Sequence, residues 1–269
     1  MVRETFIVDR FKYTVLSENG SVGTVSVGKA VDNISGDIVI PSIVKNGDIT
    51  YRVREIGSSA FSGCNDLTSV IIPDSVLGIE WNAFSKCSSL KCVYYKGNIL
   101  PRIRHSDDDV DVIIDHKFYE DTPETLVSYY PIENKSWKEA IKYGTWEGRI
   151  AIPWDPETGE IYSFIIDNLR YAVHSISKER SEGTVSVIRA DDNISGDIVI
   201  PATVMHKNIT YYVTEIGWRA FCYCSNLKNI IIPDSVTMIE NSAFWYCSGL
   251  KNIIIPNGVI EIGEYDFQG

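Results

Sequence analysis

Hydrophobic residues recur with a period of 23 in two parts of the chain. Each unit contains an Ala-Phe pair, then a cysteine, then a short apolar run before a proline. In the first run, Leu67, Val70 and Ile72 have the spacing of a strand with inward-facing apolar side chains. Pro73 ends this strand, because proline has no N–H for a ladder. The successive pairs are Ala60-Phe61, Ala83-Phe84, Ala220-Phe221, Ala243-Phe244 and, in the same register, Asp266-Phe267.

A single 23-residue unit cannot bury its own apolar face, so the units are expected to stack. Stacking creates a parallel sheet on one side, and Ser58–Phe61 predicts a short helical turn on the convex side. The expected fold is therefore mainly β with short helical turns, a leucine-rich-repeat solenoid. The core should contain the repeat phenylalanines Phe61, Phe84, Phe221 and Phe244. The repeat cysteines should be small buried thiols rather than disulfides or metal ligands, and they are Cys64, Cys87, Cys224 and Cys247.

A longer repeat shows that the chain contains two tandem duplicated modules. Gly23–Lys91 matches Gly183–Lys251 at an offset of 160, with 42 of 69 positions identical. Upstream the offset is 158, and the two-residue difference falls between Ser17–Val22 and Ser175–Glu182. Insertions are tolerated in surface turns, so this position predicts a hairpin loop in each copy.

The repeats define a domain organisation for the whole chain. Residues 1–152 form the first module, 153–160 a proline-containing linker, and 161–269 the second module, which stops inside a repeat. A helix is expected in 135–143 and a strand in 112–114. Within the modules, the leading β segments are 1–50 and 161–210, the repeats are 51–95 and 211–269, and the C-terminal segment of the first module is 96–152.

Composition narrows the class of partner. The net charge of -11 argues against nucleic acid and against anionic membrane surfaces, because both need clustered Lys and Arg. No stretch approaches 18 apolar residues, so no membrane insertion is expected. Met1–Phe6 lacks the apolar core of a signal peptide. Either the protein is cytoplasmic, or its leader is absent from this sequence.

The chain lacks the motifs of the common catalytic sites, and we expect it not to be an enzyme. It has no Gly-x-Ser-x-Gly, His-Glu-x-x-His or phosphate loop, and none of its four histidines is shared by the two copies. The acidic insert 107–115, with His105 and His116, lacks the spacing of a calcium loop. Cys222-x-Cys224 has no second ligand pair. No catalytic, cofactor-binding or metal site is predicted.

The remaining candidate site is the outer face of the repeat sheet. Alternation turns Ser69 and Ile71 outward when Leu67, Val70 and Ile72 point inward. An apolar stripe beside lysines is unusual for a solvated face. Two interpretations stay open: a free binding face, or a face covered by a neighbouring segment such as 96–152. The predicted protein-binding residues are Ser69, Ile71, Lys91, Tyr94, Lys228, Asn229, Ile231, Lys251, Asn252 and Ile254.

The repeat pattern resembles the BspA-like leucine-rich repeats of bacterial surface proteins, common in Bacteroides. It reads Ile-Gly-x-x-Ala-Phe-x-x-Cys-x-x-Leu-x-x-Ile-x-Ile-Pro-x-x-Val. The segment Gly36–Val53 is similar to the usual leading segment of that family, and Glu124–Trp146 is similar to its C-terminal segment.

The resemblance implies a non-enzymatic, adhesin-like protein at the cell surface or secreted, whose partner is a host matrix or cell-surface protein. The alternative is a structural segment of a larger surface array with no ligand of its own. Because the second module stops inside a repeat, we also expect a homodimer through its open C-terminal end.

Overall fold

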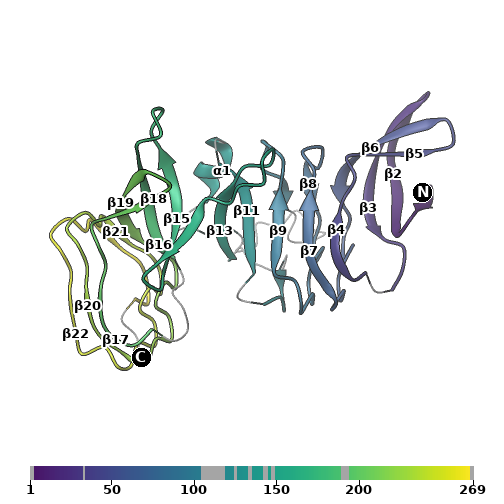
Figure 1. Ribbon diagram of the computed structural model, residues 1–269. Helices are drawn as coiled ribbons and strands as arrows, with labels where there is room; N and C mark the ends of the chain where they lie inside the picture. Colours follow the sequence, from purple (N-terminus) through teal and green to yellow (C-terminus); the bar gives the residue numbers. More distant parts are fainter. Residues whose placement is uncertain are drawn as a thin grey trace. The chain divides into compact units, whose positions relative to one another are not determined.

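The structure of the protein is a computed structural model. It divides into two compact units, Met1–Ala140 with Trp146–Ala151, and Ile141–Thr145 with Ile152–Gly269. Each is described by itself below (Figure 1). The structure describes residues 3–32, 34–103, 119–123, 126–132, 135–141, 145–146, 149–188 and 194–266.

The first unit begins with antiparallel hairpins and continues as parallel strands. β1, β2 and β3 pair antiparallel, and the tip of the β2–β3 hairpin lies at Gly20-Ser21, which confirms the predicted loop. From β3 onward the sheet is parallel through β6, β8 and β10. In spatial order the strands are β1 (Thr5–Val8), β2 (Phe11–Asn19), β3 (Val22–Lys29), β6 (Ile49–Ile56), β8 (Gly78–Ile79) and β10 (Arg102–Ile103). A further strand, β5 (Ile43–Asn46), pairs antiparallel with β6.

A second sheet of the first unit contains the repeat strands. β4, β7, β9 and β11 pair in parallel, as stacking of 23-residue units requires. Pro73 follows the last residue of β7, as predicted. The full order is β12 (Thr145–Trp146), β13 (Arg149–Trp154), β11 (Val127–Pro131), β9 (Cys92–Tyr95), β7 (Leu67–Ile72) and β4 (Gly36–Val39).

The second unit repeats this architecture. Both copies have the same register shift, between Gly36 and Asp37 in one and between Gly196 and Asp197 in the other. These glycines have φ of 72° and 77°, a conformation that a side chain disfavours. Its larger sheet has the order β14 (Ser163–Ile166), β15 (Leu169–Ile176), β16 (Glu182–Ile188), β19 (Ile209–Ile216), β21 (Met238–Ile239) and β23 (Glu261–Ile262), with β18 (Thr203–His206) against β19. Its smaller sheet has the order β17 (Gly196–Val199), β20 (Leu227–Ile231) and β22 (Asn252–Ile254).

The core is the predicted stack. The inward residues Leu67, Val70 and Ile72 are buried, and so are all four repeat phenylalanines. The turn after β6 is closed by hydrogen bonds of the i to i+3 type, such as Ala60 N–H to the Gly57 carbonyl. This confirms a mainly β fold whose repeats contain short turns. The repeat cysteines are free and buried, as expected, and Cys87 Sγ lies 3.2 Å from the carbonyl oxygen of Phe61.

The segment after the first repeats is partly described. The expected helix is α1 (Lys135–Ala140), and the hydroxyl of Ser136 in this helix donates to the Asn98 carbonyl. Trp137 is buried, and its indole N–H donates to the Gly97 carbonyl at 2.9 Å. The expected strand 112–114 and the acidic insert 107–115, with His105 and His116, lie outside the described residues.

The 153–160 stretch forms a hairpin turn. β13 extends through Pro153 and Trp154, and Trp154 bridges Ile161 in antiparallel pairing. The Asp155 carboxylate accepts hydrogen bonds from the backbone N–H groups of Glu157 and Thr158. The linker expected from the proline and glycine content is therefore a tight, internally bonded turn. No helix among the described ranges has the length and apolar content needed to cross a bilayer.

Candidate functional site

In the first unit, the outward side chains of the repeat sheet form a continuous column. Strand register places Ile71 beside Val39 on one side and Tyr94 on the other. Tyr94 in turn lies beside Tyr129 of β11, and the two rings stack at a centroid distance of 4.5 Å. Ile71 and Tyr94 are half-buried in this column. The described part of 96–152 therefore continues the sheet beyond β9, starting with β11, and packs the ring of Tyr129 against Tyr94.

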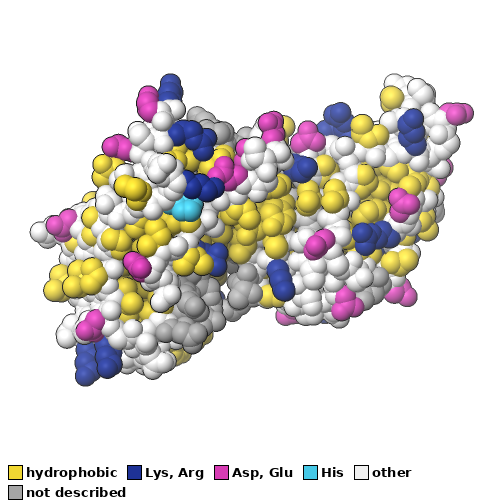
Figure 2. Space-filling view, in the orientation of Figure 1, with side chains coloured by type: hydrophobic (Ala, Val, Ile, Leu, Met, Phe, Trp, Pro, Cys, Tyr) yellow, Lys and Arg dark blue, Asp and Glu magenta, His cyan; other side chains and the backbone are white. Residues whose placement is uncertain are grey.

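The second unit has the equivalent column without the aromatic neighbours. Register places Val199, Ile231 and Ile254 side by side. Their side chains are 63%, 60% and 80% exposed, respectively. We call these three residues the aliphatic stripe. Figure 2 shows hydrophobic side chains reaching the surface of this unit among charged ones.

A polar column runs beside each apolar one. In the first unit, the hydroxyls of Thr68 and Ser69 donate to the Asp37 carboxylate at 2.6 and 2.7 Å. These two hydrogen bonds hold the pKa of Asp37 below its usual value. In the second unit, the Asn229 amide donates to Asp197 at 2.7 Å. Each apolar column therefore has an ordered hydrogen-bonding border.

The structure brings the ten predicted residues into two groups, one per unit. Ser69, Ile71 and Tyr94 lie in adjacent strands, with Lys91 exposed beside Thr68, to which its backbone N–H donates. In the second unit the polar neighbours of the aliphatic stripe are all exposed. They are Lys228, Asn229, Lys251 and Asn252.

A second surface of the second unit was not predicted from the sequence. The rings of Tyr223 and Tyr246 stack at 5.4 Å, and Trp245 packs against both. The Arg219 guanidinium lies over the rings of Trp218, at 4.6 Å, and Trp245, at 5.3 Å. Tyr223 and Tyr246 are exposed. We call these five residues the aromatic cluster.

A comparison of the two copies, residue by residue, would have predicted this cluster from the sequence. The corresponding residues of the first copy, at the offset of 160, are small or unbranched polar residues and a glycine. Five aromatic or arginine side chains therefore distinguish the second copy on adjacent turns. The first-copy residues are Ser58, Ser59, Gly63, Ser85 and Lys86.

The described residues do not form a metal site. Within the described part of the chain, no group of three or more His, Cys, Asp or Glu side chains lies close enough to hold a metal ion. Cys222 and Cys224 are both buried and free of disulfides. The outer sheet faces and the aromatic cluster are the candidate binding surfaces, because their exposed residues are more apolar or aromatic than is usual for a surface in contact with water.

The stacked parallel strands, buried Ala-Phe pairs and i+3 turns define a leucine-rich-repeat protein. The model of the BspA type leucine-rich repeat region matches six copies, over residues 24–104 and 203–269. These stretches cover more than half of the chain, which therefore belongs to the BspA type leucine-rich repeat family.

The chain is also similar to several solved structures, two of which are described as leucine-rich proteins. The pneumococcal vaccine antigen PcpA is 18% identical, with a TM-score of 0.37 over 97% of this chain and 78% of its own. A leucine-rich cell surface protein from Faecalibacterium prausnitzii is 20% identical, with a TM-score of 0.33 over 99% and 86%. A leucine-rich-repeat protein from T. pallidum is 19% identical, with a TM-score of 0.35 over 97% and 86%. No curated protein sequence matches the chain.

Proposed function

We propose that the protein binds another protein, without catalysis, through the outer sheet face of its second unit. The observation that carries this proposal is the aliphatic stripe, whose three side chains are each at least 60% exposed in neighbouring strands. Exposed apolar residues are ordinary when scattered, whereas a contiguous group is typical of an interaction site.

The surroundings of the stripe support a protein partner. Burying one isoleucine side chain contributes roughly 1.5–3 kcal/mol, so Ile231 and Ile254 together can drive association. Asn229, Asp197 and the exposed lysines form a polar border of the kind that surrounds interface cores. Lys228 and Lys251 are positive within a chain of net charge -11, which favours an acidic patch on the partner.

The aromatic cluster is a second candidate surface for the same function. Trp, Tyr and Arg are the residues most enriched among those that dominate binding energy at protein interfaces. Tyr223 and Tyr246 combine exposure with a fixed stacked geometry, so ordering them on binding has a small entropic cost.

The family membership supports a location at the cell surface and an adhesin-like role, with host matrix or cell-surface proteins as partners. The test is binding of the purified chain to immobilised extracellular matrix proteins. The double variant Ile231→Glu with Ile254→Glu should weaken binding at least roughly tenfold. The matched control is Ile165→Glu, because Ile165 is 59% exposed in the same unit but lies in β14, outside the stripe.

The double variant Tyr223→Ala with Tyr246→Ala tests whether the aromatic cluster binds the partner. Loss of binding only in this variant would transfer the function from the sheet face to the aromatic cluster. If the wild-type chain binds none of the immobilised matrix proteins, the adhesin-like role is contradicted.

The alternative function is a structural segment of a larger surface array. It is favoured by exposed apolar residues in the last described repeat, where Ile260 is 86% exposed. In that case the chain itself should associate through this repeat, as a homodimer in the simplest form. Light scattering over a concentration series detects this, and Ile260→Lys should return the protein to a monomer.

A further inference from the structure

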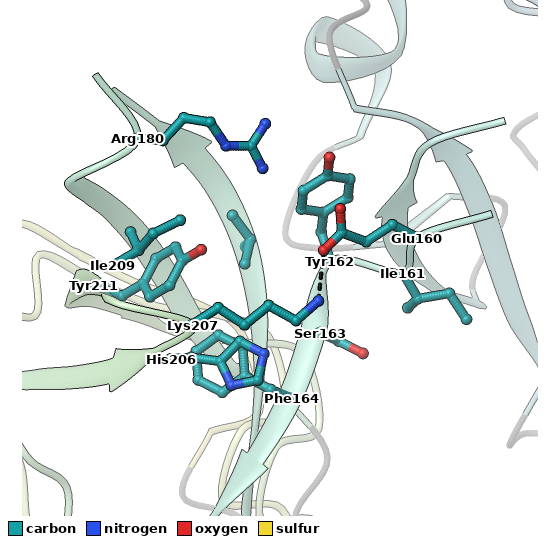
Figure 3. A pocket seen from close by; sticks show the side chains of 11 residues that line it. Glu160, Ile161, Tyr162, Ser163, Phe164, Arg180, His206, Lys207, Ile209 and Tyr211 are labelled. Atoms are coloured by element: carbon teal, nitrogen blue, oxygen red, sulfur yellow. Dashed lines mark hydrogen bonds and ion pairs between the residues drawn. The ribbon is translucent and has the colours of Figure 1, made fainter. Parts of the chain in front are cut away.

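A hollow of about 170 Å³ lies within the second unit, between β14, the tip of the β15–β16 hairpin and the β18–β19 hairpin. Figure 3 shows Arg180 and Tyr211 reaching toward this space from one side and Tyr162 and Glu160 from the other. Phe164, Val173 and Ile209 contribute apolar wall. The hollow therefore combines apolar walls with several polar side chains.

The charges around the hollow leave one cation unneutralised. Lys207 Nζ pairs with the Glu160 carboxylate at 2.6 Å. The ring of His206 stacks on Phe164 at 4.3 Å, and burial lowers the pKa of this histidine, so it is mostly neutral at pH 7. Arg180 makes no ion pair with the residues described. The side chains facing the hollow thus have a net charge of about +1 at neutral pH.

The backbone at Arg180 is fixed by hydrogen bonds within its own loop. Its backbone N–H donates to the Ser177 carbonyl at 2.9 Å, and its φ is 52°. The Ser177 hydroxyl accepts from the N–H groups of Ser181 and Glu182. This loop is the hairpin tip that is two residues longer than its counterpart in the first copy. The insertion therefore introduces a positively charged residue at a defined position.

The first copy shows what occupies the corresponding place there. The Tyr51 hydroxyl, equivalent to that of Tyr211, donates to the Glu18 carboxylate at 2.5 Å. Glu18 lies on the shorter hairpin tip, where the second copy has the Arg180 loop. A second carboxylate, that of Glu4, also raises the pKa of Tyr51, and Tyr162 replaces it in the second copy. The first copy thus supplies its own carboxylate to this tyrosine.

The second copy offers the same donor to a group from outside. The Tyr211 hydroxyl has no hydrogen-bond partner among the residues described, and burial raises its pKa, so it is protonated at neutral pH. We propose that the hollow binds a small monocarboxylate with an apolar body. Its carboxylate accepts hydrogen bonds from Arg180 and Tyr211, in the place that Glu18 occupies in the first copy.

Charge and shape favour a carboxylate over a tetrahedral oxyanion. A guanidinium is a planar fork that matches the two oxygens of a carboxylate. The single net positive charge suits a monoanion, and the Glu160 carboxylate repels a dianion such as hydrogen phosphate. The walls formed by Phe164 and Ile209 require an apolar body, which inorganic anions do not have.

The experiment is a titration of the full chain with sodium benzoate at pH 7 and constant ionic strength, followed by the NMR signals of the arginine side chains and His206. We expect saturable binding that acetate and phosphate reproduce only more weakly. Arg180→Gln and Tyr211→Phe should each weaken it roughly tenfold. Glu160→Gln should strengthen it, because this change removes a negative charge and keeps an acceptor for Lys207.

Two control variants separate the hollow from general anion binding. Arg170→Gln removes an exposed arginine from β15, and Tyr51→Phe breaks the Tyr51–Glu18 contact in the first unit. Both should leave benzoate binding unchanged. Absence of saturable binding, an equal effect of Arg170→Gln, or phosphate binding as tight as benzoate would each overturn the proposal. Arg180 is exposed, so urea melts of Arg180→Gln should match the wild type.

Discussion

The rings of Phe221 and Phe244 lie 5.4 Å apart and only 2° from parallel, although the residues are 23 positions apart in the sequence. Phe61 and Phe84 repeat the arrangement in the first unit, at 5.4 Å and 9°. Phenylalanines from two successive repeats therefore form one stacked aromatic pair in each unit. Each pair joins successive repeats in the same way that the parallel strands of those repeats pair.

Removing one of these stacked rings should destabilise the second unit. Phe221 is fully buried, so Phe221→Ala removes its packing against Phe244 and leaves a cavity. The expected loss in free energy of unfolding is about 3–5 kcal/mol. Urea melts followed by far-UV circular dichroism measure it. A loss below about 1 kcal/mol would contradict the stacking model at this position.

The two copies should respond differently to a charge on the same outward position. Ile231 is 60% exposed, so Ile231→Glu should change the free energy of unfolding by less than about 0.5 kcal/mol. Ile71 is half-buried between Val39 and Tyr94, so Ile71→Glu should cost about 1–2 kcal/mol. Chemical denaturation of both variants checks this, and equal effects would show that neighbouring side chains do not set the difference.

The six cysteines should be reduced and unreactive in the folded protein. Five are buried, and Cys92 is half-buried. Burial raises the pKa of Cys87 and of Cys247 to about 12, which suppresses the reactive thiolate. Ellman titration should report almost no thiol in the native protein and all six after denaturation. A denatured sample with fewer thiols would reveal disulfides and an oxidising compartment.

The stability of the second unit should depend on pH through Glu240. Burial is the main cause that raises the pKa of this carboxyl to about 8, followed by repulsion from Glu215, while the backbone N–H of Trp218 opposes the shift. The folded-state pKa exceeds the unfolded one, so protonated Glu240 stabilises the fold fully below about pH 4.5. This stability is lost between pH 4.5 and about 8, by on the order of 1 kcal/mol per pH unit.

Comparing variants over a pH series isolates this contribution. Glu240→Gln should flatten the pH dependence of the free energy of unfolding between pH 4.5 and 8 and exceed the wild type in stability above it. Exposed Glu264 provides the control, because Glu264→Gln should keep the wild-type slope. Parallel curves for wild type and Glu240→Gln would refute the assignment.

Local patterns in the sequence were enough to predict the repeat architecture. The spacing of Val70 and Ile72 determines which face of β7 is buried, because side chains alternate along a strand. Leu67 is also buried because the strand register shifts between Leu67 and Ser69. The period of 23 places Phe61 on Phe84, and the duplication predicts matching hairpins in both copies. Such features depend on residues close in sequence or on a regular repeat, so the sequence pattern alone is enough to predict them.

Only the tertiary structure decided how exposed and how paired the same residue types are. Ile71 and Ile231 occupy identical repeat positions, but Tyr94 lies beside Ile71 and Ile254 beside Ile231. Asp266, which stands where the other repeats have alanine, is buried and accepts a hydrogen bond from the Ala243 N–H at 2.7 Å.

The aromatic cluster and the hollow beside Arg180 likewise combine residues from separate turns and hairpins. Their geometry follows from how those segments pack in three dimensions. Burial and charge pairing depend on neighbours that are distant in sequence, so no local pattern contains them.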